Sequence, residues 1–365
     1  MITRRAPGKL LIAGEYAVVR PGHPAVVVAV DRFVTVTVSD TAAESTMTSD
    51  SNGGTRIRCG RTGDRLVPAG DRETISFFSY ALAAVRVVEQ LVVESGRPPR
   101  HFDMRIAGRD LSDADGRKFG LGSSGATTVA IVDALGAFYG LRLEAMDIFR
   151  LAMLATLTVN PRASGADLAA AVWGGWLEYR SPERARLAIA PGERDVTAKL
   201  RAAWPGLSVR PLPAPKQLRL LIGWTGEPQA TTALVARIDD EQWDTPLFAG
   251  FLADSDLCVT GLIDAIEADD VIKIQHRIGR ARRILEGLDS AAHVGIRTPV
   301  LDALCAAADL VGAAAKPSGA GGGDCGIAIL GRDSDRQATE LTRRWLAADI
   351  RPLALNIQSI ERDTP

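Results

Sequence analysis

The chain has 365 residues, of which 46% are hydrophobic and 24% are charged, an ordinary globular composition that excludes global disorder. Its 43 Lys and Arg residues nearly balance its 44 Asp and Glu residues, so we expect neither nucleic acid nor a membrane as a partner. A chain of this length is expected to form about two domains.

Several features indicate a cytoplasmic protein. No apolar run approaches the roughly 20 residues that cross a bilayer. The apolar run after Lys9 is interrupted by Glu15, so the first residues do not resemble a signal peptide. The cysteines lie far apart without a CxxC pair, which favours reduced thiols over a zinc site or a disulfide framework. They are Cys59, Cys258, Cys305 and Cys325.

The first forty residues predict strands. Residues 9–13 and 26–30 are short apolar runs, and residues 33–38 alternate and are rich in β-branched and aromatic side chains, as a half-buried strand is. Residues 41–54 are small, polar and rich in Gly and Ser, and they predict a loop or a wide hairpin connection.

Helices are expected next, beginning with apolar residues at helical spacing from residue 76 to the stop signal Gly96. The following elements are expected to be a strand at 101–106, helices at 124–138 and 144–158, and a strand at 173–179. Residues 182–215 gain proline and charge and lose periodicity, so we place a domain boundary there. The predicted domains are 1–190 and 191–365.

The C-terminal half mixes strands and helices without a regular βαβ alternation, which predicts an α+β fold in two lobes. The elements expected there are a strand at 217–224, several helices within 231–313, a strand at 325–330, a helix at 335–347 and a closing strand at 352–357.

Residues 7–16, PGKLLIAGEY, place Lys9 beside a glycine and directly before a buried type of strand. The lysine could point its ammonium into a cleft, or it could be a surface lysine at a strand edge. Residues 162–171 contribute one carboxylate, Asp167, at the start of an apolar stretch, where an acid is common for helix-dipole reasons alone.

Residues 118–127, KFGLGSSGAT, lead into an apolar helix. Glycines let the backbone approach a ligand, and the helix N-terminus attracts phosphate. Ser123 and Ser124 could each ligate Mg²⁺ or cap the helix. The spacing also fits G-x-G-x-x-G, but residues 111–117 are not the strand that a Rossmann site requires, so a dinucleotide site is disfavoured.

Residues 316–326, KPSGAGGGDCG, precede an apolar strand. Glycine at this density costs folding entropy, which favours close backbone approach to a substrate over a plain linker. The chain has six lysines, and Lys9, Lys118 and Lys316 each lie beside a glycine-rich segment. We interpret these three lysines as markers of a site that binds polyanionic small molecules.

Several motifs are absent from the sequence. There is no G-x-x-x-x-G-K-[ST] of a P-loop enzyme, no H-R-D or D-F-G of a protein kinase and no G-x-S-x-G elbow. The four histidines show no metal-ligand spacing.

Taken in order, these segments resemble the phosphomevalonate kinases of the GHMP kinase superfamily. The matching stretches are PGKLLIAGEYAVVRPGHPAV, AVDRFVTVTV, KFGLGSSGATTVA, GWTGEPQATTALV and KPSGAGGGDCGIAIL, which together span nearly the whole chain. The resemblance implies ATP and Mg²⁺ as cofactors and (R)-5-phosphomevalonate as the small-molecule partner. It also implies an N-terminal lobe like ribosomal protein S5 domain 2 and a ferredoxin-like C-terminal lobe, with the site between them.

The resemblance assigns roles residue by residue. Lys9 lies near the transferred phosphoryl group and Asp167 is the catalytic aspartate. The segment implied to wrap the ATP phosphates is Gly120, Leu121, Gly122, Ser123, Ser124, Gly125 and Ala126, with Ser124 also the Mg²⁺ ligand. The residues implied to contact the acceptor are Lys118, Ser164, Ser318, Gly319 and Ala320.

One departure from mevalonate kinases concerns the metal. Those enzymes carry a glutamate on the preceding helix that helps hold Mg²⁺, whereas residues 151–159 offer no carboxylate here. We therefore expect no second protein carboxylate at the metal. Because an acceptor phosphate is mostly dianionic at pH 7, with a second pKa of about 6, we expect Lys9 to be the main electrostatic catalyst. Asp167 is expected to orient Lys9 or water at the metal more than to remove a proton.

Four alternatives remain on sequence grounds. Mevalonate kinase differs in its alcohol acceptor, and diphosphomevalonate decarboxylase releases CO₂. A non-catalytic metabolite sensor on the same fold would bind nucleotide without turnover, although it need not keep Lys9, Ser124 and Asp167 together. A Rossmann dehydrogenase would bind NAD(P)H. The oligomeric state does not follow from the sequence.

Overall fold

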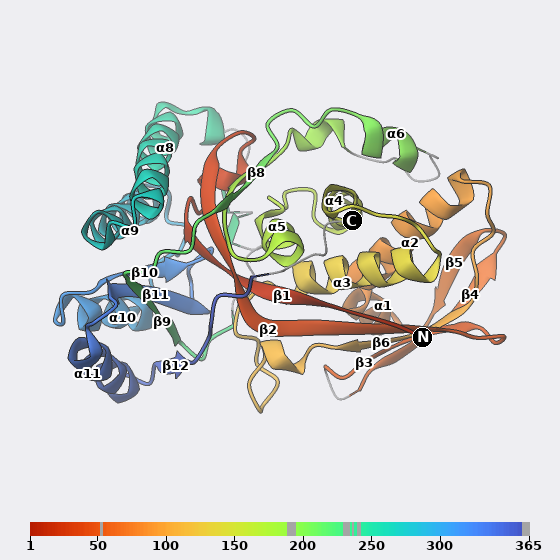
Figure 1. The fold of residues 1–365 in the computed structure, drawn as a ribbon, viewed down its shortest axis with the longest axis horizontal. Helices are drawn as coiled ribbons and strands as arrows, with labels where there is room; N and C mark the ends of the chain where they lie inside the picture. The colour runs from red at the N-terminus through yellow and green to blue at the C-terminus, as the bar shows by residue number, and fades with distance from the viewer. Residues whose placement is uncertain (52–53, 188–194, 229–233, 236, 239–241, 360–365) are drawn as a thin grey trace.

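The computed structural model describes residues 1–51, 54–187, 195–228, 234–235, 237–238 and 242–359. These residues form two sheets, each with helices packed on it (Figure 1). The predicted α+β architecture in two parts is therefore confirmed. The stretch GWTGEPQATTALV falls partly on residues 229–233, which lie outside the described residues.

The first sheet has eight described strands in the order β5-β4-β3-β6-β2-β7-β8, with β1 pairing on β2. All its pairings are antiparallel except that of β3 with β6. The strands are β1 (Ile2–Ala13), β2 (Pro24–Asp40), β3 (Ser45–Ser49), β4 (Arg56–Thr62), β5 (Arg65–Ala69), β6 (Phe102–Ala107), β7 (Trp176–Arg180) and β8 (Ser208–Leu212).

Helices cover one face of this sheet. Alternate residues of β2, such as Val34, Val36 and Val38, are buried, as expected for a sheet that is covered on one face. The helices of this part are α1 (Arg72–Phe77), α2 (Ser79–Glu94), α3 (Ser123–Phe138), α4 (Ala145–Val159), α5 (Ala166–Trp173) and α6 (Val196–Arg201). Short 3₁₀ turns are η1 (Ala17–Val19), η2 (Arg109–Leu111) and η3 (Arg184–Arg186).

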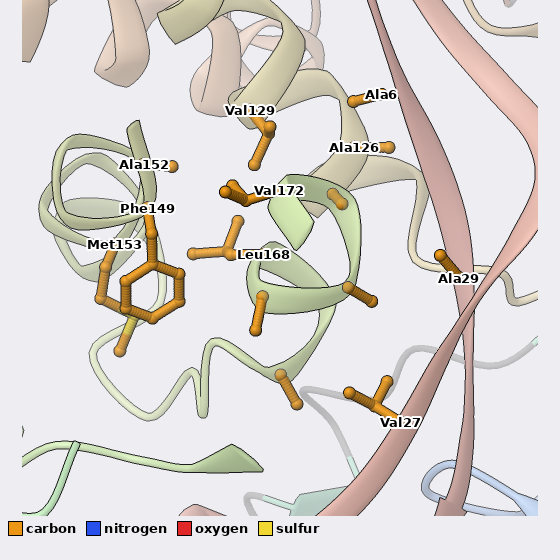
Figure 2. Close-up of a cluster of buried hydrophobic side chains, with 14 of the residues drawn as sticks. Ala6, Val27, Ala29, Ala126, Val129, Phe149, Ala152, Met153, Leu168 and Val172 are labelled. Carbon is orange, nitrogen blue, oxygen red and sulfur yellow. The ribbon is translucent and has the colours of Figure 1, made fainter. Parts of the chain in front are cut away.

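Helix α5 is surrounded by apolar side chains. Figure 2 shows Leu168 and Val172 of α5 among side chains from α3, α4 and the strands, including Val129, Phe149 and Val27. Each of these residues is at most 1% exposed. The packing fixes α5 against the sheet, and it therefore fixes Asp167 in the first turn of α5.

The second sheet has the described order β10-β11-β9-β12, with antiparallel pairing throughout. This connectivity is that of a split βαβ or ferredoxin-like unit. Its strands are β9 (Leu218–Trp224), β10 (Ala314–Ser318), β11 (Cys325–Gly331) and β12 (Arg351–Leu353). Its helices are η4 (Gln242–Asp244), α8 (Pro246–Glu267), α9 (Val271–Ala292), α10 (Pro299–Asp309) and α11 (Asp335–Ala347).

The change of sheet falls later than the predicted boundary, whose residues 190 and 191 lie outside the described residues. Strand β8 still pairs with β7 of the first sheet, and β9 is the first strand of the second. The predicted closing strand at 352–357 is shorter, because after β12 the chain returns to the first sheet. There Ile357 bridges Val30, and the Asn356 amide donates to Asp31 at 2.8 Å.

The loop predicted at residues 41–54 contains a strand, β3. Most of its side chains are polar although they are buried, so the sequence did not indicate a strand. The Ser45 hydroxyl accepts from the Phe102 amide at 3.2 Å, and the Thr46 hydroxyl donates to Asp103 at 2.5 Å. Satisfied hydroxyls replace the apolar alternation on which the strand prediction depends.

Helix α8 is, by length and composition alone, apolar enough to cross a membrane. In this structure it packs against α9, and its buried residues include Phe248 and Phe251 within a cluster that also contains Leu285 of α9. A core helix of this kind passes the same test, so the finding is weak evidence for a span.

Candidate active site

Strand β1 places Lys9 against the glycine loop, which we define as residues 120–126. A register shift between Pro7 and Gly8 interrupts pairing with β2, and a Cβ on Gly8 would lie 2.9 Å from the Leu121 carbonyl oxygen. The Lys9 amide donates to the Leu121 carbonyl at 2.8 Å, and Nζ of Lys9 lies 3.5 Å from the Gly120 carbonyl oxygen. Lys9 itself is partly exposed.

The N-terminus of α3 offers free N–H groups. Gly120 and Gly122 have φ values of 79° and 74°, in the left-handed region that glycine adopts without a steric penalty. Gly122 is the N-cap residue, and no described side chain caps the helix. Ser123 and Ser124 follow as the first helical residues and are partly exposed. A helix start of this kind binds phosphate.

Two glycines of the loop leave room for Lys9 and Asp167. A Cβ on Gly122 would lie 3.0 Å from Cγ of Lys9 and 3.3 Å from Cβ of Asp167. A Cβ on Gly125 would lie 2.4 Å from Oδ2 of Asp167. Since any larger residue would collide with these charged side chains, the loop brings Lys9 and Asp167 together at the start of α3.

A carboxylate that sequence reasoning did not assign, Asp324, reaches the same loop. A Cβ on Gly120 would lie 2.4 Å from Cγ of Asp324, so this side chain packs directly on the loop. Asp324 has a φ of 54°, which is uncommon for a residue with a side chain. It is the only acidic residue of the segment 316–326, and that was the signal available in the sequence.

The Asp167 carboxylate has an unusual electrostatic environment. Its Oδ1 accepts from the Leu168 amide at 3.0 Å. Burial raises the pKa of Asp167, while the charge of Lys9 acts in the opposite direction. Burial, together with the charge of Asp167, raises the pKa of Tyr80 on α2. The charge of Lys9 therefore favours the ionised form of Asp167 against the effect of burial, and a carboxylate with a perturbed pKa beside a lysine is typical of a functional site.

Ser164 lies on the turn that carries Asp167. The Tyr179 hydroxyl donates to the Ser164 carbonyl at 2.5 Å, and a Cβ on Gly165 would lie 2.8 Å from both the Tyr179 hydroxyl and Sδ of Met153. The Ser164 side chain is partly exposed, and its hydroxyl accepts from the Ala166 amide at 3.4 Å. The turn is thus packed against Met153 of α4 and Tyr179 of β7.

Ser318, Gly319 and Ala320, which are expected to contact the acceptor, differ in whether their polar groups are already hydrogen-bonded within the protein. The Ser318 hydroxyl accepts from the Leu11 amide at 3.1 Å and donates to the Leu11 carbonyl at 2.9 Å, so it joins β10 to β1. The Ala320 carbonyl accepts from the Tyr16 hydroxyl at 2.5 Å. Gly319 has open space on its Cβ side and is partly exposed, whereas Ser318 and Ala320 are buried.

The interpretation of three lysines as markers of one site is wrong for Lys316. Lys118 is exposed and its backbone forms a β-bridge with Ser112, so its role toward the acceptor stays a prediction. Lys316 is fully buried and forms an ion pair with Glu15. The charge of Lys316 is therefore paired with that of Glu15 inside the protein, where solvent does not reach it.

The oxygen donors of the site suit Mg²⁺ bound together with a nucleotide. Ser124 offers a hydroxyl and Asp167 a carboxylate on either side of Gly125. The described residues contain no group of three or more His, Cys, Asp or Glu side chains arranged to hold a metal. Mg²⁺ typically takes one or two protein oxygens and completes its shell with water and phosphates, so this set fits.

Comparisons with known proteins agree with this geometry. The chain is 45% identical over 362 residues to a phosphomevalonate kinase from Streptomyces sp. (strain CL190), covering 97% of this chain and 96% of that protein. The structure resembles Streptococcus pneumoniae phosphomevalonate kinase in complex with phosphomevalonate and AMPPNP, with a TM-score of 0.84 and 29% identity over 98% of this chain and 100% of that one.

Mevalonate kinases are more distant. The one from Thermococcus sibiricus (strain DSM 12597 / MM 739) is 27% identical over 347 residues, covering 92% of this chain and 91% of that protein. Residues 79–175 match the GHMP kinases N terminal domain, and residues 262–349 match the GHMP kinases C terminal domain. On this evidence, and with Lys9, the glycine loop and Asp167 in one place, the chain belongs to the GHMP kinase family.

Proposed function

We propose that the chain transfers the γ-phosphoryl group of ATP to (R)-5-phosphomevalonate, giving (R)-5-diphosphomevalonate and ADP in the mevalonate pathway of isoprenoid biosynthesis. The observation that carries the proposal is the 45% identity to a phosphomevalonate kinase over nearly the whole chain. The convergence of Lys9 and Asp167 on the glycine loop supplies the groups that such a transfer needs.

The glycine loop, Gly120 to Ala126, binds the ATP phosphates in this proposal. Its left-handed glycines bring backbone N–H groups close to the phosphate oxygens, and the positive end of the α3 dipole stabilises their charge. Ser124 and Asp167 hold Mg²⁺, which when bound neutralises part of the phosphate charge.

The acceptor phosphate needs no strong base. Its second pKa is about 6, so most molecules are dianionic at neutral pH and carry a nucleophilic oxygen. That oxygen forms a bond to the γ-phosphorus while the bond to the β–γ bridging oxygen breaks, and ADP leaves with the electron pair. The difficulty is the approach of two anions, and the Lys9 ammonium stabilises the charge that accumulates between them.

Asp167 then acts as an orienting group. Its Cβ borders Gly122 together with the Lys9 side chain, and its carboxylate lies beside Gly125, so Asp167 restricts where the ammonium points. On the acceptor side we place Gly319 first because it is partly exposed and open on its Cβ side. Lys118, Ser164, Ser318 and Ala320 stay predictions for this role.

The test is a steady-state assay of ADP release with ATP, Mg²⁺ and either phosphomevalonate or mevalonate. Turnover of phosphomevalonate with no turnover of mevalonate supports the proposal, and the reverse result assigns the chain to mevalonate kinases. Nucleotide binding without turnover of either acceptor points to a sensor. We further propose a cytoplasmic location, where ATP is available and the described cysteines, all free, stay reduced.

A further inference from the structure

Two segments far apart in the sequence are joined by a buried ion pair. Lys316 of β10 and Glu15, two residues after β1, have side chains that are 0% and 1% exposed, and Nζ of Lys316 contacts Oε1 of Glu15. Nζ of Lys316 also donates to the Pro317 carbonyl at 2.6 Å. The pair connects the turn that follows β1 of the first sheet to β10 of the second.

Other contacts surround this pair at the same place. The Ser318 hydroxyl bonds both backbone groups of Leu11, and the Tyr16 hydroxyl donates to the Ala320 carbonyl at 2.5 Å. The Gly319 amide lies 3.5 Å from Oε1 of Glu15. We call these contacts, between residues 11–16 and residues 316–320, the junction.

The junction carries features that a plain structural contact does not require. Buried ion pairs often add no net stability over apolar residues of the same volume. Oε2 of Glu15 is buried without a hydrogen-bond partner among the described residues, and Glu15 lines a small pocket together with Ser255 and Cys258. Tyr16 holds a φ of 61°, which is strained for a residue with a bulky side chain.

The junction lies between the two halves of the site. Strand β1, which ends two residues before Glu15, carries Lys9. Directly after Ser318 comes Gly319, the backbone that we place at the acceptor. If the junction moved, the distance between the acceptor and the Lys9 ammonium would change, while the glycine loop and its bound nucleotide would stay on α3.

We propose that Glu15 and Lys316 are positioning residues that lock the loop 319–323 to β1 and so hold the acceptor against Lys9. The proposal rests on the proposed function for its kinetic consequences and on the buried pair for its structural ones. It predicts that breaking the pair impairs the use of the acceptor more than the use of ATP.

The experiment compares Glu15→Gln, Lys316→Met and the double variant with the wild type. We expect kcat/KM for phosphomevalonate to fall by roughly 10²-fold, the effect of a small misplacement at a reacting centre. The KM for ATP should stay within about threefold, because nucleotide contacts are unchanged. The double variant should regain thermal stability relative to the singles, since no buried charge is left unpaired, without regaining acceptor kinetics.

A matched control is the buried pair of Arg61 and Glu89, whose side chains are 12% and 4% exposed and which joins β4 to α2. Glu89→Gln should lower the melting temperature without changing either KM. The proposal is overturned if folded Glu15→Gln keeps wild-type acceptor kinetics, if both substrates are impaired equally, or if the double variant restores acceptor kinetics along with stability.

A second measurement separates failure of this proposal from failure of the proposed function. Hydrogen exchange of the amides in 319–323, measured without ligands, should be faster by about tenfold in Glu15→Gln than in the wild type. If the wild type does not turn over phosphomevalonate, the proposed function is wrong, and this exchange measurement still decides the junction. Unchanged exchange in a folded variant overturns the lock.

Discussion

Two regions of this molecule place a lysine and a carboxylate beside a glycine-rich segment, and they differ in access to water. At the glycine loop, Lys9 and Asp167 are both partly exposed. At the junction, the side chains of Lys316 and Glu15 are almost completely buried. Burial therefore distinguishes a charged pair that can bind a substrate from one that only supports the fold. Only a pair that water can reach can also meet a polyanionic substrate.

The same contrast explains the roles of the glycines. Gly122 and Gly125 admit charged side chains that face the site, so the loop is shaped by the groups it must position. Gly14 lies within the junction, where a Cβ would lie 2.6 Å from the Pro24 carbonyl oxygen, so this glycine allows two backbone segments to approach closely. Glycine density alone does not distinguish these uses.

The largest expected effect is at Lys9. Lys9→Met should lower kcat by roughly 10²–10³-fold, the size of losing one preorganised charged donor, with little change in the KM for ATP. Steady-state kinetics with varied ATP and phosphomevalonate measure both quantities. A kcat within a few-fold of wild type would show that the partly exposed pair is not where the electrostatic catalysis resides.

Gly125→Ala should follow. The added Cβ would lie 2.4 Å from Oδ2 of Asp167 and must displace the carboxylate, so we expect kcat/KM to fall by roughly 10²-fold. The matched control is Gly287→Ala on α9, where a Cβ meets nothing within 4 Å. That change should leave kinetics unaltered and stabilise the protein by about 0.5–1 kcal/mol. Equal kinetics in both variants would contradict the packing argument.

Asp167→Asn separates activity from stability. Burial raises the folded pKa of Asp167 above its ordinary value of 3.8, so the native state holds this proton more tightly than the unfolded state. The contribution of Asp167 to the free energy of unfolding is therefore fully present below about pH 3.8, and it is lost as pH rises through the folded pKa. The Asp167→Asn variant does not lose this stability, because its amide does not titrate.

We therefore expect Asp167→Asn to lower kcat while its melting temperature relative to wild type rises from about pH 4 toward pH 7. Thermal unfolding of the ligand-free proteins across this range measures the difference. A variant whose relative stability falls with pH would mean that Lys9 outweighs burial in setting the charge of this carboxylate.

The smallest kinetic effect is expected at Ser318. Its hydroxyl is already bonded to the Leu11 amide and carbonyl, so Ser318→Ala should reduce the free energy of unfolding by about 1–3 kcal/mol and leave the acceptor KM within about threefold. Denaturant unfolding and acceptor titration measure these quantities. A large rise in acceptor KM at unchanged stability would restore the direct contact that the sequence resemblance implied.

Much of the fold could be predicted from the sequence. The alternation at residues 33–38 lies within β2, and the helix expected at 144–158 is α4 (Ala145–Val159), with a reciprocal Glu144 and Asp147 cap. Strand β3 was missed because its buried side chains, apart from Met47, are hydroxyls, and the sheets change only after residue 212 because the short, polar β8 still pairs with β7. Rules based on local sequence patterns detect hydrophobic residues, but they cannot detect that a buried hydroxyl has a hydrogen-bond partner elsewhere in the chain.

The candidate site divides in the same way. Its residue types and order along the chain, from Lys9 through the glycine loop to Asp167, were determined by the sequence, because each is a local signal of charge or backbone freedom. Only the tertiary structure decided which charges share the site. It buried Lys316 against Glu15 and brought Asp324 onto Gly120, since exposure and neighbours depend on how two sheets pack and on no single segment.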